Sequence, residues 1–359
     1  MKIASVVGAR PNFIKLAPIH KAITNFSDHV IIHTGQHYDY KLSEIFFKEF
    51  NLPKPNFNLK VGSGTPGFQI GEMVKRLEKI FLESHFELVL VYGDTNSTFA
   101  GALSAVKSGI SVAHVESGLR SFDRYMPEEI NRVLTDHLSD YLFAPTQTAI
   151  KNLQREHVFG KVFNPGDISV EIVKVAVQLS SKSLILNNLQ LVPKSYILFT
   201  MHRVENTDSA ESLISVIHAF EILSEVEIVF PIHPRTLQMF RGKNMLERLE
   251  ECKNVRLIQP VGYVDFIKLM QNAKKVITDS GGVQKESYLL GIPCITIRKN
   301  TEWVETVNEG WNILTDTDTN KIVNATRDWM PPATIQMKPI FGDGRTSLVI
   351  KNSIMSLMP

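Results

Sequence analysis

Short apolar runs alternate with helix-like segments along nearly the whole chain of 359 residues. Runs such as Lys2–Val7, Leu88–Tyr92 and Tyr196–Thr200 have the length and the β-branched content of buried strands. Apolar residues recur at helical spacing between them, for example in Thr95–Lys107 and Tyr263–Asn272. This alternation predicts an α/β protein whose parallel sheets are built from βαβ units.

The alternation occurs once in each half of the chain. The first half adds expected strands at Val30–Thr34, Ser111–Val115 and Tyr141–Ala144, and helices at Pro18–Phe26, Tyr40–Phe50 and Gln69–Glu83. The second half adds strands at Glu227–Pro231, Val255–Ile258, Lys275–Thr278 and Cys294–Ile297, and helices at Ser209–Ser224, Thr236–Arg248 and Gly282–Leu290. The polar segment Gln178–Pro193 reads as a linker. We predict doubly wound domains at 1–177 and 194–340, with a ligand cleft at the carboxyl ends of the strands.

The bulk composition disfavours several classes of protein. The 39 basic and 37 acidic residues give a net charge of +2, which argues against a nucleic-acid binder that relies on bulk charge. Cys252 and Cys294 make neither a disulfide framework nor a zinc site, which favours a reducing interior. No apolar run approaches the ~18 residues of a membrane span. We expect a cytoplasmic protein without nucleic-acid or membrane partners.

The segment Lys274–Ser287 predicts a site for an anion. It reads as a short strand, a turn of Ser280, Gly281 and Gly282, and the first turn of a helix. The first amides of a helix lack intrahelical partners, the helix dipole is positive there, and glycines let a phosphate approach. Glu286 lies one turn further on and suits the hydroxyls of a nucleotide. The alternative is a plain strand-to-helix turn.

Acidic residues follow two expected strands of the first half. Asp94 comes after one strand, Glu116 after the next, and a helix start carries Glu128 and Glu129. The alternatives are that Asp94 serves only as a helix cap and that the glutamates only complement a helix dipole. If these carboxylates converge on one cleft, they suit acid–base chemistry.

Basic residues follow other strands. Arg10 and Lys15 come after the first strand, and His202, Arg203 and His233 follow strands of the second half. They suit phosphate contact, although a solvated helix start or a structural histidine would give the same pattern.

One aromatic residue is a candidate for binding a nucleotide base, and the sequence has no metal-binding motif. Phe266 suits stacking on a base, although a place in a helix core explains it equally. No cluster of His, Cys and Asp has metal-ligand spacing, so we expect no metal.

Taken together, these segments resemble the UDP-N-acetylglucosamine 2-epimerases. The resemblance rests on motifs whose order and spacing span nearly the whole chain: GARPNFIK at Gly8–Lys15, TGQH at Thr34–His37, YGDTNST at Tyr92–Thr98, HVESGLRS at His114–Ser121, PEEINR at Pro127–Arg132, MHRVEN at Met201–Asn206, HPR at His233–Arg235, DSGGVQKES at Asp279–Ser287, TEWVET at Thr301–Thr306 and FGDGRTS at Phe341–Ser347.

The resemblance implies a GT-B-like fold of two Rossmann-like domains, with a last helix, within 341–359, that packs back on the first domain. It implies removal of the C-2 proton of UDP-N-acetylglucosamine, elimination of UDP, and re-addition to give UDP-N-acetylmannosamine for glycan synthesis, with no cofactor and in a homodimer. The family's catalytic positions match Asp94, Glu116, Glu128 and His202. The UDP-binding positions match Arg10, Lys15, His202, Phe266, Ser280, Gly281, Gly282 and Glu286, and we add Arg132, Arg203 and His233.

Other functions share this fold. The same chemistry on a UDP-2,3-diacetamido uronic acid, a hydrolysing epimerase and a glycosyltransferase are the enzyme alternatives. A catalytically inactive nucleotide-sugar sensor is the alternative that is not an enzyme.

Overall fold

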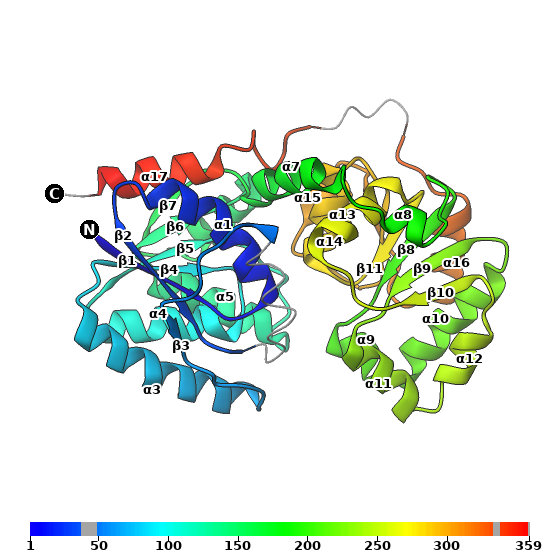
Figure 1. The fold of residues 1–359 in the computed structure, drawn as a ribbon, viewed down its shortest axis with the longest axis horizontal. Helices are drawn as coiled ribbons and strands as arrows, with labels where there is room; N and C mark the ends of the chain where they lie inside the picture. The colour runs from blue at the N-terminus through cyan, green and yellow to red at the C-terminus, as the bar shows by residue number, and fades with distance from the viewer. Residues whose placement is uncertain (37–48, 333–337, 358–359) are drawn as a thin grey trace. The chain divides into compact units, whose positions relative to one another are not determined.

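The computed structural model describes residues 1–36, 49–332 and 338–357 (Figure 1). The chain divides into two compact units: unit 1 is Met1–Ile172 with Pro339–Pro359, and unit 2 is Val173–Lys338. The first division falls within helix α7 (Ser169–Ser180) rather than in the polar segment 178–193. That segment is part of unit 2 because Leu186 and Leu191 are buried in its apolar core. The helix expected at Tyr40–Phe50 lies almost entirely outside the described residues.

Unit 1 contains a seven-stranded parallel sheet in the order β3-β2-β1-β4-β5-β6-β7. Its strands are β1 (Lys2–Val7), β2 (Asp28–His33), β3 (Phe57–Asn58), β4 (Leu88–Tyr92), β5 (Ser111–Val115), β6 (Tyr141–Phe143) and β7 (Lys161–Phe163). The chain runs outward in one direction from β1 and in the other from β4. The carboxyl ends of β1 and β4 therefore form a topological switch point, where doubly wound sheets bind ligands.

The helices of unit 1 connect and cover these strands. They are α1 (Arg10–Ile23), α3 (Pro66–Ser84), α4 (Asn96–Lys107), α5 (Pro127–Leu138), α6 (Gln147–Arg155), the start of α7, and α17 (Thr346–Ser356). Helix α1 begins well before the predicted Pro18, because Pro11 favours a helix start and Pro18 is accommodated inside the helix. Helix α17 packs against α1 (Figure 1).

Unit 2 repeats the same topology. Its six parallel strands have the order β10-β9-β8-β11-β12-β13, so the switch point lies between β8 and β11. The strands are β8 (Tyr196–Thr200), β9 (Glu227–Pro231), β10 (Val255–Ile258), β11 (Lys275–Thr278), β12 (Cys294–Thr296) and β13 (Asn312–Leu314).

The helices of unit 2 are α8 (Ile185–Asn188), α9 (Val204–Thr207), α10 (Ala210–Ile222), α11 (Pro234–Gly242), α12 (Leu246–Glu251), α13 (Tyr263–Asn272), α14 (Gly281–Leu289), α15 (Val304–Asn308) and α16 (Thr319–Arg327). The single helix predicted at Thr236–Arg248 is two helices, because Asn244 takes a left-handed φ of 55° between them.

Both faces of the unit 2 sheet are buried. Along β8, Ile197 and Phe199 face one apolar cluster, whereas Tyr196 and Leu198 face the other. Successive strand side chains point to opposite faces, so this division shows helices packed on both sides. The predicted α/β class with two Rossmann-like, doubly wound sheets is confirmed. None of the helices in the described ranges has the length and hydropathy needed to span a bilayer.

Candidate active site

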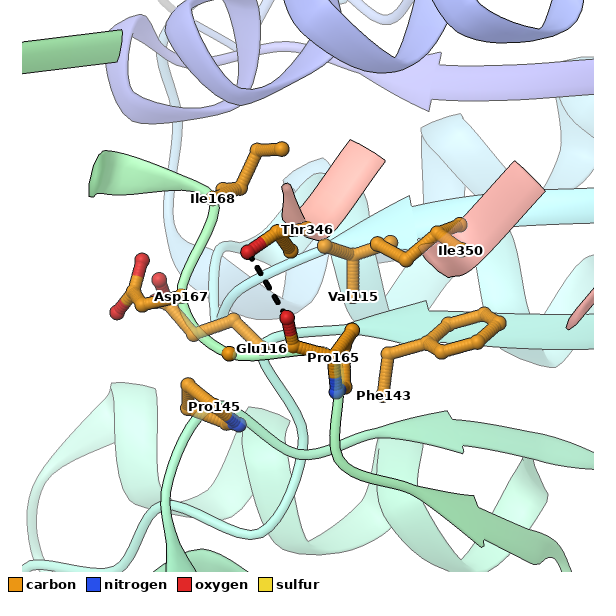
Figure 2. Close-up of a pocket in the computed structure, with 10 residues that line it drawn as sticks. Val115, Glu116, Phe143, Pro145, Pro165, Asp167, Ile168, Thr346 and Ile350 are labelled. Atoms are coloured by element: carbon orange, nitrogen blue, oxygen red, sulfur yellow. Dashed lines mark hydrogen bonds between the residues drawn. The ribbon is translucent and has the colours of Figure 1, made fainter. Parts of the chain in front are cut away.

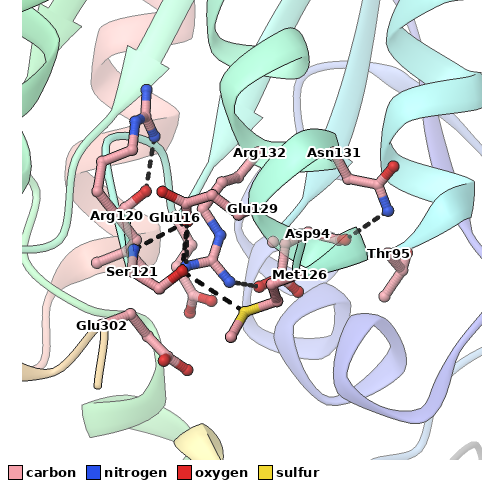
Figure 3. A network of polar contacts seen from close by, with 12 residues as sticks. Asp94, Thr95, Glu116, Arg120, Ser121, Met126, Glu129, Asn131, Arg132 and Glu302 are labelled. Atoms are coloured by element: carbon pink, nitrogen blue, oxygen red, sulfur yellow. Dashed lines mark hydrogen bonds and ion pairs between the residues drawn. The ribbon is translucent and has the colours of Figure 1, made fainter. Parts of the chain in front are cut away.

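The first candidate carboxylate, Asp94, follows β4 and forms an ion pair. Its Oδ2 lies 2.6 Å from Nη2 of Arg132, whose side chain is almost fully buried (Figure 3). Asn131 donates through Nδ2 to the Asp94 carbonyl oxygen at 3.0 Å. The side chain of Asp94 is 30% exposed, so a ligand can reach it. Side chains of helix α5 thus contact both the backbone and the carboxylate of Asp94.

The second candidate carboxylate, Glu116, follows the neighbouring strand β5 and pairs with a different cation. Its Oε1 lies 2.6 Å from Nζ of Lys15 on α1, and both side chains are largely buried. Glu116 has a φ of 75°, which costs a residue with a side chain about 1–2 kcal/mol. Non-glycine residues in this conformation occur mainly where surrounding structure enforces them, often at functional sites.

Gly93 allows the Lys15–Glu116 pair to form. It has a φ of 66°, and a Cβ at this position would lie 2.9 Å from Nζ of Lys15 and 3.6 Å from Oε1 of Glu116. The glycine in the motif around Asp94 is therefore favoured for two reasons: its positive φ, and the lack of room for a side chain.

The paired glutamates at the start of α5 have different surroundings. Glu129 is buried and accepts hydrogen bonds from the backbone amides of Ser121 and Phe122 at 2.9 and 2.8 Å, and from the Ser121 hydroxyl at 3.0 Å (Figure 3). It also lies 3.2 Å from Arg132. Glu128 is partly exposed and, within the described part of the chain, has no hydrogen-bond or ion-pair partner. Only Glu128 is therefore available to a ligand.

The turn after β1 lies next to the Asp94 turn. The Asn12 side chain accepts from the amides of Gly8 and Ala9 and donates to the carbonyl oxygen of Tyr92 at 2.8 Å. These bonds join the start of α1 to the end of β4, and so bring Lys15 to Glu116. Arg10 is the first residue of α1, and its side chain lies outside the described part of the structure.

A small pocket lies behind Glu116, in unit 1. Its lining includes Glu116, Asp167 and the C-terminal residues Thr346 and Ile350 (Figure 2). Thr346 donates to the carbonyl oxygen of Pro165 at 3.1 Å. The C-terminal segment thus helps to form the surroundings of Glu116.

In unit 2, the glycine turn after β11 leads into α14 as predicted. Ser280 is the N-cap residue, and its side chain makes no capping bond. A Cβ on Gly281 would lie 2.2 Å from Oε1 of Glu302, so a side chain there would require the buried Glu302 carboxylate to move. Among the described residues, a Cβ on Gly282 would approach only the Ser280 hydroxyl, at 3.9 Å, so space above its backbone is open. The turn has the geometry of a helix N-terminus that an anion can approach.

Asp279 joins this turn to the loop that carries His202 and Arg203. It is fully buried and accepts from the backbone amides of His202 at 3.1 Å and Arg203 at 2.9 Å, and from Nδ2 of Asn206 at 3.2 Å. The half-exposed imidazole of His202 has Nδ1 3.6 Å from Oδ1 of Asp279. The carboxyl ends of β8 and β11 are thereby held together by one carboxylate.

The remaining candidates have clear local environments. Glu286 accepts from the Tyr263 hydroxyl at 2.8 Å. Phe266 is buried in an apolar cluster of unit 2, which agrees with a place in a helix core, the alternative to stacking on a base. His233 caps α11, because its side chain accepts from the Arg235 amide at 3.2 Å. Among the described residues, no three His, Cys, Asp or Glu side chains gather to hold a metal ion.

Comparison with known proteins shows the family of the chain. The model of the UDP-N-acetylglucosamine 2-epimerase family matches residues 21–355. The chain belongs to this family. A UDP-N-acetylglucosamine 2-epimerase homologue from Methanococcus maripaludis is 51% identical over 99% of the chain and 100% of the relative.

Two further relatives are informative. A crystal structure of the Methanocaldococcus jannaschii UDP-GlcNAc 2-epimerase, in complex with UDP-GlcNAc and UDP, is 43% identical, with a TM-score of 0.94 over 99% of this chain and 100% of that one. A UDP-2,3-diacetamido-2,3-dideoxy-D-glucuronate 2-epimerase from Pseudomonas aeruginosa is 41% identical over 99% of the chain and 100% of the relative. The family therefore contains epimerases of more than one sugar nucleotide.

Several residues that shape the site were not singled out from the sequence. Asp279, Asn12 and Tyr263 each act through contacts with residues distant in the chain. Asp279 and Asn12 lie inside motifs of the family resemblance, and their place in those motifs could have identified them as site residues. The different environments of Glu128 and Glu129 had no sequence signal, because both start the same helix.

Proposed function

We propose that this protein interconverts UDP-N-acetylglucosamine and UDP-N-acetylmannosamine at C-2, through elimination and re-addition of UDP. The observation that carries the proposal is the pair of carboxylates on adjacent strand ends, each with its own cation: Asp94 with Arg132, and Glu116 with Lys15. Family membership supports the same reaction.

Inversion at C-2 needs groups that remove and return a proton. The C-2 hydrogen is adjacent to no carbonyl group and is weakly acidic, so a fixed base and a stabilised leaving group are both required. The Lys15 ammonium stabilises the ionised form of Glu116, which is the form that accepts a proton. We propose Glu116, Asp94 and Glu128 as the acid–base set of unit 1.

Departure of UDP needs stabilisation of negative charge. The N-terminus of α14 at Gly281 and Gly282, the His202 imidazole and the Arg203 guanidinium suit a diphosphate. Glu286, oriented by Tyr263, suits the ribose hydroxyls. We also propose Arg10 and Phe266 as nucleotide contacts on family resemblance alone, and His233 because it follows strand β9 in the way that His202 follows β8.

Proton NMR of UDP-N-acetylglucosamine incubated with the protein in deuterated water, without added metal, tests the proposal. Deuterium at C-2 together with UDP-N-acetylmannosamine is the expected result. Free N-acetylmannosamine with UDP would replace the proposal with the hydrolysing reaction. An unchanged sugar would contradict it.

A second substrate has a specific observation in its favour. The diacetamido uronate epimerase relative is as similar, at 41% identity, as a curated UDP-N-acetylglucosamine 2-epimerase from Methanococcus maripaludis, also at 41%. The same NMR assay with the diacetamido uronic acid nucleotide distinguishes the two. Faster C-2 exchange with that substrate would favour the second function.

The cellular setting is also proposed. Cys252 and Cys294 are both buried and free, which suits a reducing cytoplasm where nucleotide sugars are used. A homodimer is proposed on family resemblance, and light scattering after size exclusion would test it.

A further inference from the structure

We propose that His114 is a protonated positioning residue: its imidazolium locks the turn that carries Asp94 and places a buried positive charge beside the acid–base set. The role deepens the proposed epimerase function and rests on it. His114 lies on β5, two residues before Glu116, and its side chain is fully buried.

Both ring nitrogens of His114 face groups that accept hydrogen bonds. Nε2 lies 2.7 Å from the carbonyl oxygen of Gly93, which can only accept. Nδ1 lies 2.7 Å from Oδ1 of Asp136 on α5. A neutral imidazole has one N–H. If His114 were neutral, one of these short contacts would therefore place a nitrogen lone pair against an oxygen.

The other contacts of Asp136 stabilise the ionised form of its carboxylate. Its Oδ2 accepts from the Gly118 amide at 3.0 Å and from Nη1 of Arg120 at 2.7 Å. Burial would raise the pKa of Asp136, but hydrogen bonds and charge from His114 and Arg120 hold that pKa below its ordinary value. With Asp136 ionised, Nδ1 of His114 must donate.

The local charge balance favours the same protonation state. Arg120 also pairs with Glu156, which follows α6, through its other guanidinium nitrogens. With a protonated His114, two cations face the two anions Asp136 and Glu156. With a neutral His114, the cluster would carry one net negative charge, although the Glu156 side chain is 27% exposed and part of that charge reaches solvent. His137, which is largely exposed, reaches Glu156 only at 3.6 Å.

The contact with Gly93 links this charge to the site. The Gly93 amide donates to the Val115 carbonyl oxygen at 2.9 Å, and its own carbonyl oxygen accepts from His114. Gly93 is thus fixed to β5 at both ends, directly before Asp94. A Cβ on Gly93 would lie within 3.6 Å of both Lys15 Nζ and Glu116 Oε1, so the turn borders that pair. A shift of this turn would move Asp94 against Arg132 and loosen the space around Glu116.

Nitrogen-15 NMR of histidine-labelled protein at neutral pH tests the protonation state. His29 is a matched internal control: its ring contacts are the Ser5 hydroxyl and the His20 ring, both at 2.8 Å, and burial, with the charge of His20, lowers the pKa of His29 to about 3. We expect two protonated ring nitrogens for His114 and one for His29. A single protonated nitrogen on His114 would overturn the proposal, whatever the enzyme's activity.

The variant His114→Gln tests the positioning role. Glutamine can donate to Gly93 but carries no charge. We expect kcat to fall by about 10–100-fold, because small displacements of reacting groups have effects of this size, while the KM for UDP-N-acetylglucosamine stays within about twofold. The acidic limb of the pH–kcat profile should move to higher pH, because carboxylates near a lost positive charge are protonated more easily.

The two measurements separate this role from the function itself. A folded His114→Gln protein with wild-type kcat and an unchanged pH profile would refute the positioning role. If the variant fails to fold, the NMR measurement on the wild-type protein still decides the protonation state. If the wild-type protein has no epimerase activity, the proposed function fails while the result for His114 stands.

Discussion

Glutamine in place of Glu128 should impair turnover, whereas glutamine in place of the adjacent Glu129 should impair stability. Both residues start α5 and are chemically identical, so each variant is the control for the other. The difference comes from their surroundings: Glu129 is buried with four partner groups, and Glu128 is partly exposed.

The expected loss for Glu129→Gln follows from its contacts. The new NH₂ group must replace an oxygen that faces either the Phe122 amide or the two Ser121 donors and Arg132. A buried donor without an acceptor costs about 1–3 kcal/mol, and loss of one partner of a buried ion pair costs about 3–5 kcal/mol. These costs overlap, so we expect about 3 kcal/mol in the free energy of unfolding. For a unit of this size, Tm should fall by roughly 6–12 °C.

For Glu128→Gln we expect the opposite outcome. Substitution of a partly exposed side chain without a bonding partner changes stability by about 0.5 kcal/mol or less. Loss of an acid–base group lowers kcat by about 100-fold or more. UDP affinity should stay close to that of the wild type, because Glu128 is not among the proposed nucleotide contacts.

Thermal unfolding by circular dichroism and turnover by C-2 deuterium exchange measure the two effects on matched samples. If Glu128→Gln lowered Tm as much as Glu129→Gln and retained full turnover, the assignment of the two glutamates from burial would be wrong. A Glu129→Gln protein with wild-type Tm would contradict the contacts described for the loop after β5.

Three more predictions concern other parts of the site and fold. Glu116→Gln should lower turnover by about 100-fold or more with UDP affinity nearly intact, and near-normal turnover would remove Glu116 from the mechanism. Glu286→Ala should weaken UDP binding by about 1–3 kcal/mol in calorimetry, with Tyr263→Phe as a milder control, and unchanged affinity would mean that the ribose is bound elsewhere. Acid should destabilise unit 1 through His29, whose pKa is lowered to about 3 by burial and by His20, so the folded state favours its neutral form. The contribution of His29 to the free energy of unfolding is fully present above pH ~6.5 and is lost as the pH falls toward 3, with about 2 kcal/mol lost by pH 5. A free energy of unfolding that stays constant between pH ~6.5 and pH ~3 would contradict this prediction.

The central strands were the most predictable part of the fold. Strands β4, β5 and β8 have the predicted bounds, because buried parallel strands are continuous apolar runs between polar turns. Strands β7 and β13 were not predicted, since each has three residues at a sheet edge and no such run. Apolar patterning reports burial, and short edge strands bury too little to be read from it.

The positions of the site were more predictable than its contacts. A strand end followed by an acidic residue with a glycine close by indicates where Asp94 and Glu116 lie, since parallel strands end at one edge of a sheet. It does not indicate which cation each will meet. Lys15 contacts Glu116 because α1 packs beside β4, and Arg132 contacts Asp94 because α5 packs against α4. Such pairings depend on tertiary packing, which local sequence does not encode.

Buried carboxylates organise the site residues in both units. Asp136 binds the Gly118 amide two residues after Glu116, and Asp279 binds the amides of His202 and Arg203. Each buried anion holds a loop that carries residues of the candidate site. Glu116 needs this support most, because its φ of 75° would relax if the loop were free. Acid–base groups must stay within a fraction of an ångström of their working positions, so loops anchored by charge-assisted bonds suit a reaction that removes and returns one proton.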